Sequence, residues 1–219
     1  MSGNFKKDLF AQFARVAKAL GNGHRLELLE FLAQGERNVD DLARVSGLSV
    51  RNTSQHLQQL RQVGLVTSRK EGLHVYYRLT GDDVVLLMQC VRGVAERHLA
   101  DVKVLVDTYL TVKDALEPMP VKDLLERARK GEVTVLDVRP SEEYAAGHLP
   151  GAVNIPLAEL ERHLDELRDS GEVVAYCRGP HCVLAFEAVE RLRGQGLRAR
   201  RLQDGFPEWK AAGMPVETE

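Results

Sequence analysis

Two of the three cysteines of this chain lie five positions apart, as Cys177 and Cys182 in the segment YCRGPHC, residues 176–182. The segment follows the apolar run EVVAY and precedes VLAFEAVERLRGQG, whose apolar spacing is helical. A cysteine between a buried parallel strand and a helix lies at the carboxyl end of a sheet, where open α/β folds bind ligands. Loop amides, the helix N-terminus and Arg178 would stabilise a thiolate there. The sequence therefore predicts a catalytic site of Cys177, Arg178 and Cys182.

The second thiol leaves two kinds of chemistry open. Cys182 could react with Cys177 to give a disulfide, if the two Cα atoms lie within about 7 Å. Alternatively, Cys177, His181 and Cys182 are three soft ligands for copper(I), zinc or arsenite. We predict no cofactor and no metal site.

The size and composition of the chain indicate two ordinary globular domains. With 219 residues, 44% hydrophobic and 28% charged, it is long enough for two domains of about 100 residues each. No apolar run approaches the roughly 20 residues of a membrane span, and the N-terminus lacks the apolar core of a signal peptide. An odd number of cysteines argues against a secreted disulfide framework. We expect a cytoplasmic protein without a membrane partner.

A basic stretch in the first half suggests a surface that meets phosphate. Over residues 44–78 only Glu71 opposes a set of lysines and arginines: Arg44, Arg51, Arg61, Arg69, Lys70 and Arg78. On charge alone, a solvated basic face explains this stretch equally well.

The first half of the sequence is typical of helices followed by a hairpin. Helical apolar spacing covers residues 8–20, 24–34, 38–46 and 50–63. The last of these begins after Ser49, the expected N-cap, and its expected buried side is Val50, Leu57, Leu60 and Val63. Two β-rich runs, at residues 65–69 and 74–79, are separated by a turn that contains Gly72.

The helix over residues 50–63 has the composition of a DNA reader. Its exposed side is rich in amides and hydroxyls and poor in acids, which suits base edges and phosphates in a major groove. The predicted DNA-binding residues are those of this side, together with two at the hairpin tip: Arg51, Asn52, Ser54, Gln55, Gln58, Arg69 and Lys70.

Residues 83–112 predict a single amphipathic helix, roughly 45 Å long. An apolar stripe that long indicates packing against a second copy, so we expect a homodimer through the first and last helices of this half. Cys90 lies in the long helix and is expected to be a buried small residue at the dimer interface.

Beyond the two prolines of DALEPMP, strand and helix patterns alternate. Expected strands are VTVLDVR, EVVAYC and LRARRL, and expected helices are SEEYAAG, LAELERHLDELR, VLAFEAVERLRGQG and PEWKAAG. Such alternation with buried strands predicts an α/β domain with a parallel sheet. The predicted domains are residues 1–113 and 121–219, with a linker over residues 114–120.

Three motifs of the first half, RVAKALGNGHRLELLEFL, DLARVSGLSVRNTSQHLQQLRQVGLV and RKEGLHVYYRL, together resemble the ArsR (arsenical-resistance repressor) family over roughly residues 8–112. The resemblance implies a mainly α winged helix-turn-helix and a homodimeric repressor with its recognition helix at residues 50–63. A two-fold dimer would bind double-stranded DNA at an inverted-repeat operator. Metal-sensing members carry a cysteine pair where this chain has GERNVDDL, so direct metal sensing by this half is not expected.

Three motifs of the second half, VLDVRPSEEYAAGHLPGAVNIPL, YCRGPHC and DGFPEWKAAGMPVE, resemble the rhodanese family over about residues 120–217. The resemblance implies that Cys177 accepts a sulfane sulfur as a persulfide and that Asp137, Arg139 and Glu143 form structural ion pairs. A six-residue active-site loop is associated in this family with sulfur transfer. Two residues depart from the pattern: Pro180 lacks an N–H donor, and Cys182 stands where many members place arginine or a small polar residue. A persulfide on Cys177 could be attacked by Cys182, giving a disulfide or a bridged polysulfide. The resemblance thus favours sulfur chemistry over a metal site.

Together these features predict a DNA-binding regulator, a repressor, whose rhodanese-like domain responds to a sulfane sulfur donor through Cys177 and Cys182. Three alternatives remain. The second half could be a sulfurtransferase, with DNA binding serving autoregulation; it could be an inert interaction module; or the protein could be a repressor that senses a metal or metalloid through the two cysteines.

Overall fold

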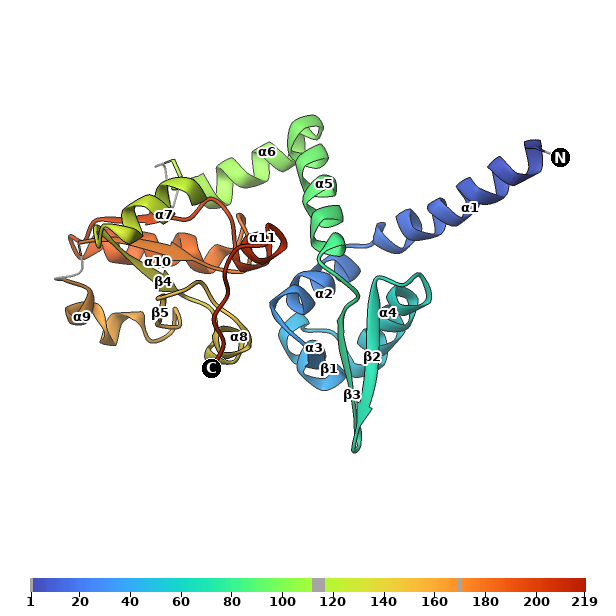
Figure 1. The fold of residues 1–219 in the computed structure, drawn as a ribbon, viewed down its shortest axis with the longest axis horizontal. Coiled ribbons are helices and arrows are strands. Elements are labelled where there is room, and N and C mark those ends of the chain that lie inside the picture. The colour runs from blue at the N-terminus through green and yellow to red at the C-terminus, as the bar shows by residue number, and fades with distance from the viewer. Residues whose placement is uncertain (1, 112–116, 169–170) are drawn as a thin grey trace. The chain divides into compact units, whose positions relative to one another are not determined.

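The computed structural model describes residues 2–111, 117–168 and 171–219, which form two compact units, Met1–Val84 and Val85–Glu219 (Figure 1). The first unit is mainly helical with a β-hairpin, and the second is built on a parallel sheet. Both features confirm the predicted fold class. Within the described ranges, no helix is long and apolar enough to cross a membrane.

The first unit contains four helices and a small antiparallel sheet. The helices are α1 (Ser2–Leu20), α2 (Gly23–Gln34), α3 (Val39–Ser46) and α4 (Val50–Gln62). The sheet has the order β1-β3-β2, with β1 at Arg37–Asn38, β2 at Val66–Glu71 and β3 at His74–Leu79. Strands β2 and β3 form the expected hairpin, and Gly72, with φ of 58°, makes the turn.

Caps and core residues fix the position of α4. The hydroxyl of Ser49 accepts a hydrogen bond from the amide of Asn52 at 3.2 Å, so the predicted N-cap is confirmed. Leu57 and Leu60 are fully buried, as expected. Val50 is 50% exposed, and its predicted burial is wrong because it lies in the first helical turn, beyond the edge of the core.

The single helix expected over residues 83–112 is wrong. The chain forms α5 (Asp83–His98), α6 (Ala100–Val106) and a π-helical turn, η1 (Asp107–Thr111), and residue 112 lies outside the described residues. At Leu99 the backbone is extended, with φ of −105° and ψ of 108°, and α6 leaves in a new direction (Figure 1). No glycine or proline marks this break, and the apolar spacing continues across it. The sequence pattern therefore does not reveal it.

The second unit holds a four-stranded sheet in which each neighbouring pair is parallel, in the order β5-β4-β6-β7. The strands are β4 (Val133–Asp137), β5 (Val153–Asn154), β6 (Glu172–Tyr176) and β7 (Ala199–Arg201). The parallel sheet is thus confirmed, and β5 is a two-residue strand that the sequence pattern did not predict.

Helices cover both faces of this sheet. They are α7 (Val121–Arg129), α8 (Ser141–Ala146), α9 (Leu164–Arg168), α10 (Val183–Gly194) and α11 (Phe206–Ala211). The helix expected over LAELERHLDELR is shorter than predicted, because a 3₁₀ turn, η2 (Leu160–Arg162), precedes α9 and His163 separates them.

Successive residues of β6 face two different cores. Val173, Ala175 and Cys177 belong to one core cluster with α10, whereas Val174 and Tyr176 belong to the other, with Phe206 and Trp209 of α11. This alternation is the usual two-residue period of a strand buried on both faces. It places the Cys177 side chain on the α10 side of the sheet.

Candidate functional site

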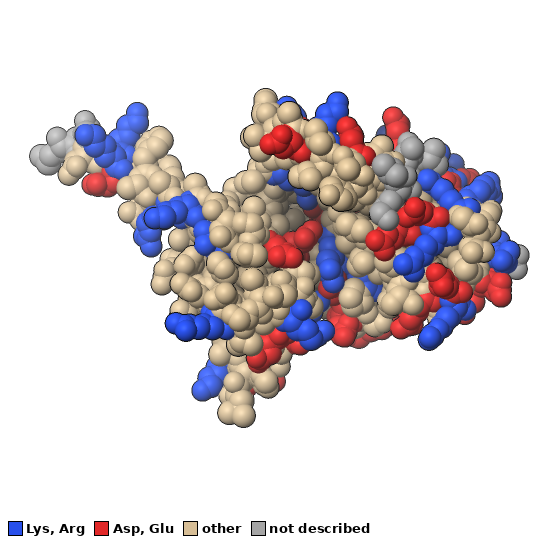
Figure 2. Space-filling model, turned by 180° about the vertical axis from the view of Figure 1, so that it is seen from behind, with Lys and Arg blue, Asp and Glu red and all other residues tan. Residues whose placement is uncertain are grey.

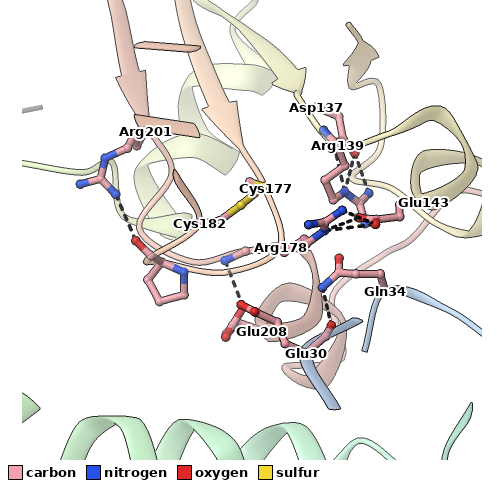
Figure 3. Close-up of a disulfide and its surroundings, with 12 residues drawn as sticks. Glu30, Gln34, Asp137, Arg139, Glu143, Cys177, Arg178, Cys182, Arg201 and Glu208 are labelled. Atoms are coloured by element: carbon pink, nitrogen blue, oxygen red, sulfur yellow. Dashed lines mark hydrogen bonds and ion pairs between the residues drawn. A yellow bond between two sulfur atoms is a disulfide. The ribbon is translucent and has the colours of Figure 1, made fainter. Parts of the chain in front are cut away.

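The two cysteines of the loop after β6 are joined by a disulfide. Cys177 follows the last residue of β6 and is 1% exposed, and Cys182 is the N-cap residue of α10. Their Cα atoms lie 6.1 Å apart, within the 7 Å that the sequence-based proposal required (Figure 3). The loop therefore brings the two predicted thiol positions into direct contact.

The segment before α11 holds this loop in place. The amide of Phe206 donates a hydrogen bond to the carbonyl of Cys177 at 3.0 Å. Gly205 lies so close to the loop that a Cβ there would be 2.3 Å from the amide nitrogen of Gly179. Arg201 donates to the carbonyl of Pro180 at 3.4 Å, and its guanidinium stacks over the Phe186 ring.

Two amides of the loop donate no hydrogen bond within the described residues, those of Gly179 and His181, and Pro180 between them has no N–H. The Gly179 amide nitrogen lies against Gly205. The 12-residue helix α10 begins directly after the loop, and the partial positive charge of its N-terminus also favours an anion. A thiolate or persulfide at this loop would be stabilised by these groups.

Asp137 and Arg139 form a fully buried ion pair beside the loop. The guanidinium donates to the Asp137 carboxylate, at 2.6 Å for the shortest bond, and to the carbonyl of Gly147 at 2.8 Å. It also stacks over the rings of Tyr176 and Phe206. Burial acts to lower the pKa of Arg139, but its bonds to Asp137 outweigh this effect and raise it. The pair is a structural element, as the rhodanese resemblance implied.

Arg178 is turned towards Glu143 of α8. It donates to both oxygens of this carboxylate, at 2.7 to 3.1 Å, and the Glu143 side chain is 1% exposed (Figure 3). The charge of Arg178 is thus compensated by a carboxylate 35 residues away in the sequence. The sequence did not reveal this pairing, and the main local support for an anion is therefore the amides and the α10 N-terminus.

The predicted DNA-binding residues of α4 lie on its open side. Arg51, Asn52, Gln55 and Gln58 are exposed, and Ser54 is partly exposed.

On the face that Figure 2 shows, Lys and Arg side chains of the second unit are interspersed with Asp and Glu. On this face, the second unit presents a surface of mixed charge.

The two predicted residues of the wing differ in their surroundings. Arg69 is ion-paired with Glu36 and Glu71 and stacks on Tyr76, and hydrogen bonds to the two carboxylates raise its pKa. Lys70 is exposed on β2, and within the described residues it has no ion-pair partner. The charge of Arg69 is already compensated within the chain, whereas that of Lys70 is open to a phosphate.

Arg25 of α2 is a functional candidate that sequence reasoning missed. It is 9% exposed and donates to the carbonyls of Lys18 and Ala19 and, at 2.7 Å, to the amide oxygen of Gln59 on α4. This one side chain ties the end of α1 to the predicted recognition helix. The sequence shows only an arginine within a predicted helix, and nothing in the local pattern marks it as buried.

The metal site of the alternative hypothesis would require a cluster of side chains that could bind the ion. Among the residues that the structure describes, no group of three or more His, Cys, Asp or Glu side chains is arranged to hold a metal ion. The third cysteine, Cys90 of α5, is exposed in the single chain.

Comparison with known protein families agrees with this architecture. A rhodanese-like domain matches residues 120–212, and the arsR family of bacterial regulatory proteins matches residues 22–68. The chain is 49% identical to the HTH-type transcriptional regulator Rv0324 of Mycobacterium tuberculosis, over 97% of this chain and 93% of that protein.

Two solved structures resemble single halves of the chain. One is the winged helix-turn-helix domain of a possible ArsR-family regulator from Mycobacterium bovis, described as homodimeric, with 47% identity, a TM-score of 0.41, and coverage of 44% of this chain and 89% of that domain. The other is a rhodanese-related protein from Thermoplasma volcanium, with 30% identity, a TM-score of 0.42, and coverage of 48% and 100%.

The match to Rv0324 covers both units and nearly the full length of both proteins, and each half also matches a family model of its own. The chain belongs to the ArsR-type transcriptional regulators that carry a winged helix-turn-helix followed by a rhodanese-like domain.

Proposed function

We propose that this regulator is a repressor that senses sulfane sulfur through Cys177 and Cys182. The disulfide between these two residues is the observation that carries the proposal, because it places a second thiol within reach of a persulfide on the first. The proposed domains are residues 1–113 for DNA binding and dimerisation and 121–219 for sensing. Part of the proposed linker, residues 114–120, lies outside the described residues.

The proposed chemistry has two steps. The Cys177 thiolate attacks the outer sulfur of a donor R–S–SH, forming Cys177–S–SH and releasing RS⁻. The Cys182 thiolate then attacks the Cys177 sulfur, forming the disulfide and releasing HS⁻. In total, the dithiol and R–S–SH give the disulfide, R–SH and H₂S, so the protein loses two electrons and the sulfane sulfur gains them.

We further propose that DNA is bound by a homodimer at an inverted repeat. The exposed residues of α4, with Lys70 of the wing, suit base edges and phosphates. Large exposed apolar side chains on α1 and α5 support a dimer interface there: Phe5, Phe10, Phe13, Leu86, Val91 and Val94.

The test is DNA binding to the region upstream of the protein's own gene, before and after inorganic polysulfide. Wild type is expected to lose affinity. Cys177→Ser should keep its affinity, because the first step cannot occur. Cys182→Ser should accumulate a persulfide, visible by mass spectrometry as one added sulfur, without forming the disulfide.

Other outcomes would favour the alternatives. Equal affinity of wild type and Cys177→Ser throughout would overturn the sensor proposal. Steady turnover of thiosulfate with cyanide would then indicate a sulfurtransferase, and tight stoichiometric binding of zinc or arsenite would indicate a metal-responsive repressor.

A further inference from the structure

One turn of α5 contacts the sulfur site, and it does so through two residues. Arg92 and Glu96 are four positions apart and therefore lie on the same side of the helix. Arg92 donates to the carboxylate of Glu208 at 2.9 Å. Glu96 lies 3.4 Å from the Nε2 atom of His181 in the active-site loop. All of these residues belong to the second unit, Val85–Glu219.

Glu208 connects Arg92 to the loop backbone. Its side chain is 7% exposed, and its second oxygen accepts a hydrogen bond from the amide of Gly205 at 3.2 Å. Gly205 in turn contacts the backbone of Gly179, and the next residue donates to the carbonyl of Cys177. A movement of the loop must therefore displace Gly205, and with it the carboxylate that holds Arg92.

The His181 contact is of a different kind. Burial lowers the pKa of His181, and Arg92 and Arg201 add to this effect, while Glu96 and Glu208 oppose it. The lowered pKa favours the neutral imidazole, which weakens the ion-pair attraction to Glu96. The charged pair of Arg92 and Glu208 is the stronger link between α5 and the loop.

The opposite side of α5 carries different residues. With 100° per residue, Gln89, Arg92, Gly93 and Glu96 share one side, and they line a cavity of about 360 Å³ together with loop residues such as Pro180 and His181. Val91 and Val94 lie on the other side and are exposed. The helix thus presents one side to the sulfur site and an apolar side to the proposed partner copy, and the cavity leaves room for it to shift.

We infer that Arg92 is the residue through which α5 senses the state of the two cysteines. With the disulfide formed, as in this structure, the loop, Glu208 and Arg92 are held together and α5 is fixed. When the disulfide is reduced, Cys182 is released from Cys177, the loop relaxes and Arg92 loses its fixed partner. This inference rests on the proposed function and identifies the fixed arrangement of α5 as the state of low DNA affinity.

The experiment compares DNA affinity of the full chain in the reduced and the disulfide state, with dithiothreitol and inorganic polysulfide as reagents. Wild type is expected to bind the upstream DNA about 5- to 150-fold more weakly as the disulfide, the usual range of allosteric coupling. In Arg92→Glu and Arg92→Gln the ratio of the reduced to the disulfide-state DNA affinity should fall towards one, while the disulfide still forms. Arg92→Lys, which keeps the charge, should retain most of it.

Arg97→Glu is the matched control. It makes the same charge change on the same helix at an exposed position, and Arg97 has no ion-pair partner within the described residues. The ratio of its DNA affinities in the reduced and the disulfide state should equal that of wild type.

A second measurement tests the link in the reverse direction. Because coupling is reciprocal, DNA must shift the midpoint potential of the Cys177–Cys182 couple in wild type by the same coupling factor. It should leave the potential of Arg92→Gln unchanged.

The possible failures can be told apart. If wild type responds and the Arg92 variants respond equally, the role of Arg92 is wrong and the sensor proposal stands. If wild type itself shows no difference between the two states, the sensor proposal is wrong, and the role of Arg92 falls with it.

Discussion

Cys182 has two structural roles: it is the disulfide partner of Cys177 and the N-cap residue of α10. N-cap residues are usually Ser, Thr, Asp or Asn, whose side-chain oxygen accepts a hydrogen bond from the first turn. Cys182 makes no such side-chain bond. The Cys182 side chain therefore leaves the first amides of α10 uncapped, although the amide of Ala185 donates to the Cys182 carbonyl at 3.2 Å.

His56 on α4 predicts a pH dependence of stability. Its Nδ1 atom is buried without a hydrogen-bond partner among the described residues, and burial, Arg25 and His24 lower its pKa below 6.5. Well above pH 6.5 the imidazole is neutral in both the folded and the unfolded chain. As the pH falls through 6.5, the unfolded chain takes up the proton more readily, so the free energy of unfolding should fall from about pH 7 downwards.

His56→Gln should reduce this fall, measured by urea denaturation at several pH values. The fall should not vanish, because the pKa of His181 is lowered as well. His98→Gln, at an exposed position on α5, serves as the control and should follow wild type. Parallel curves for wild type and His56→Gln would contradict the prediction.

At the level of elements, the contact between Gly205 and the active-site loop gives a second prediction. A Cβ at position 205 would lie within 2.6 Å of backbone atoms of Arg178 and Gly179, which cannot rotate away. Gly205→Ala should therefore lower the free energy of unfolding by about 1–3 kcal/mol, the usual cost of overpacking. It should also slow formation of the Cys177–Cys182 disulfide, because the loop must move.

Gly194→Ala provides the matched control for this change. Gly194 is the last residue of α10, and a Cβ there would meet no atom within 4 Å. Its stability should equal or slightly exceed that of wild type, since alanine favours helix more than glycine does. If thermal unfolding gave the same result for both variants, the contact at position 205 would have no energetic role.

The sequence predicted those elements whose signals are local. The apolar run of β6, the helical spacing of α10 and the short segment between them sufficed to predict that Cys177 and Cys182 share one strand-to-helix loop. Ser49 was likewise predicted as a cap from its place before a helical pattern. Each of these features depends on residues that are near one another in the chain.

The remaining features depend on contacts between distant residues. Arg178 meets Glu143 across 35 positions, and Arg69 meets Glu36 across 33. The break at Leu99 has no glycine or proline to mark it. Periodicity records which side of an element is apolar, and it carries no information on which charged partner a folded chain will supply.

At the scale of the whole molecule, the apolar side of α1 predicts a dimer that one charge can disrupt. Phe10 and Phe13 are 58% and 57% exposed on a helix that projects from the rest of the first unit (Figure 1). Phe13→Glu places a carboxylate among these rings, so sedimentation should show a monomer at concentrations where wild type is dimeric. DNA affinity should fall as well, because each monomer can occupy only one half-site.

Ala11→Glu introduces the same charge on the opposite side of α1 and should leave the dimer intact. Ala11 is exposed and lies about 160° around the helix from Phe13. If both variants dimerised like wild type, α1 would not contribute to the interface.

The two-sided pattern of α5 also determines which genetic changes this regulator can tolerate. Substitutions on one side leave the other side in place, so each side can diverge separately. Deletion of a single residue within α5 would rotate everything after it by 100° and shift it by 1.5 Å, turning Arg92 and Glu96 away from the positions they now occupy. Insertion of seven residues, close to two full turns, would nearly restore the orientation. We therefore expect lineages of such regulators to keep Arg92 and to change the length of this helix only by about two full turns, while its other positions vary.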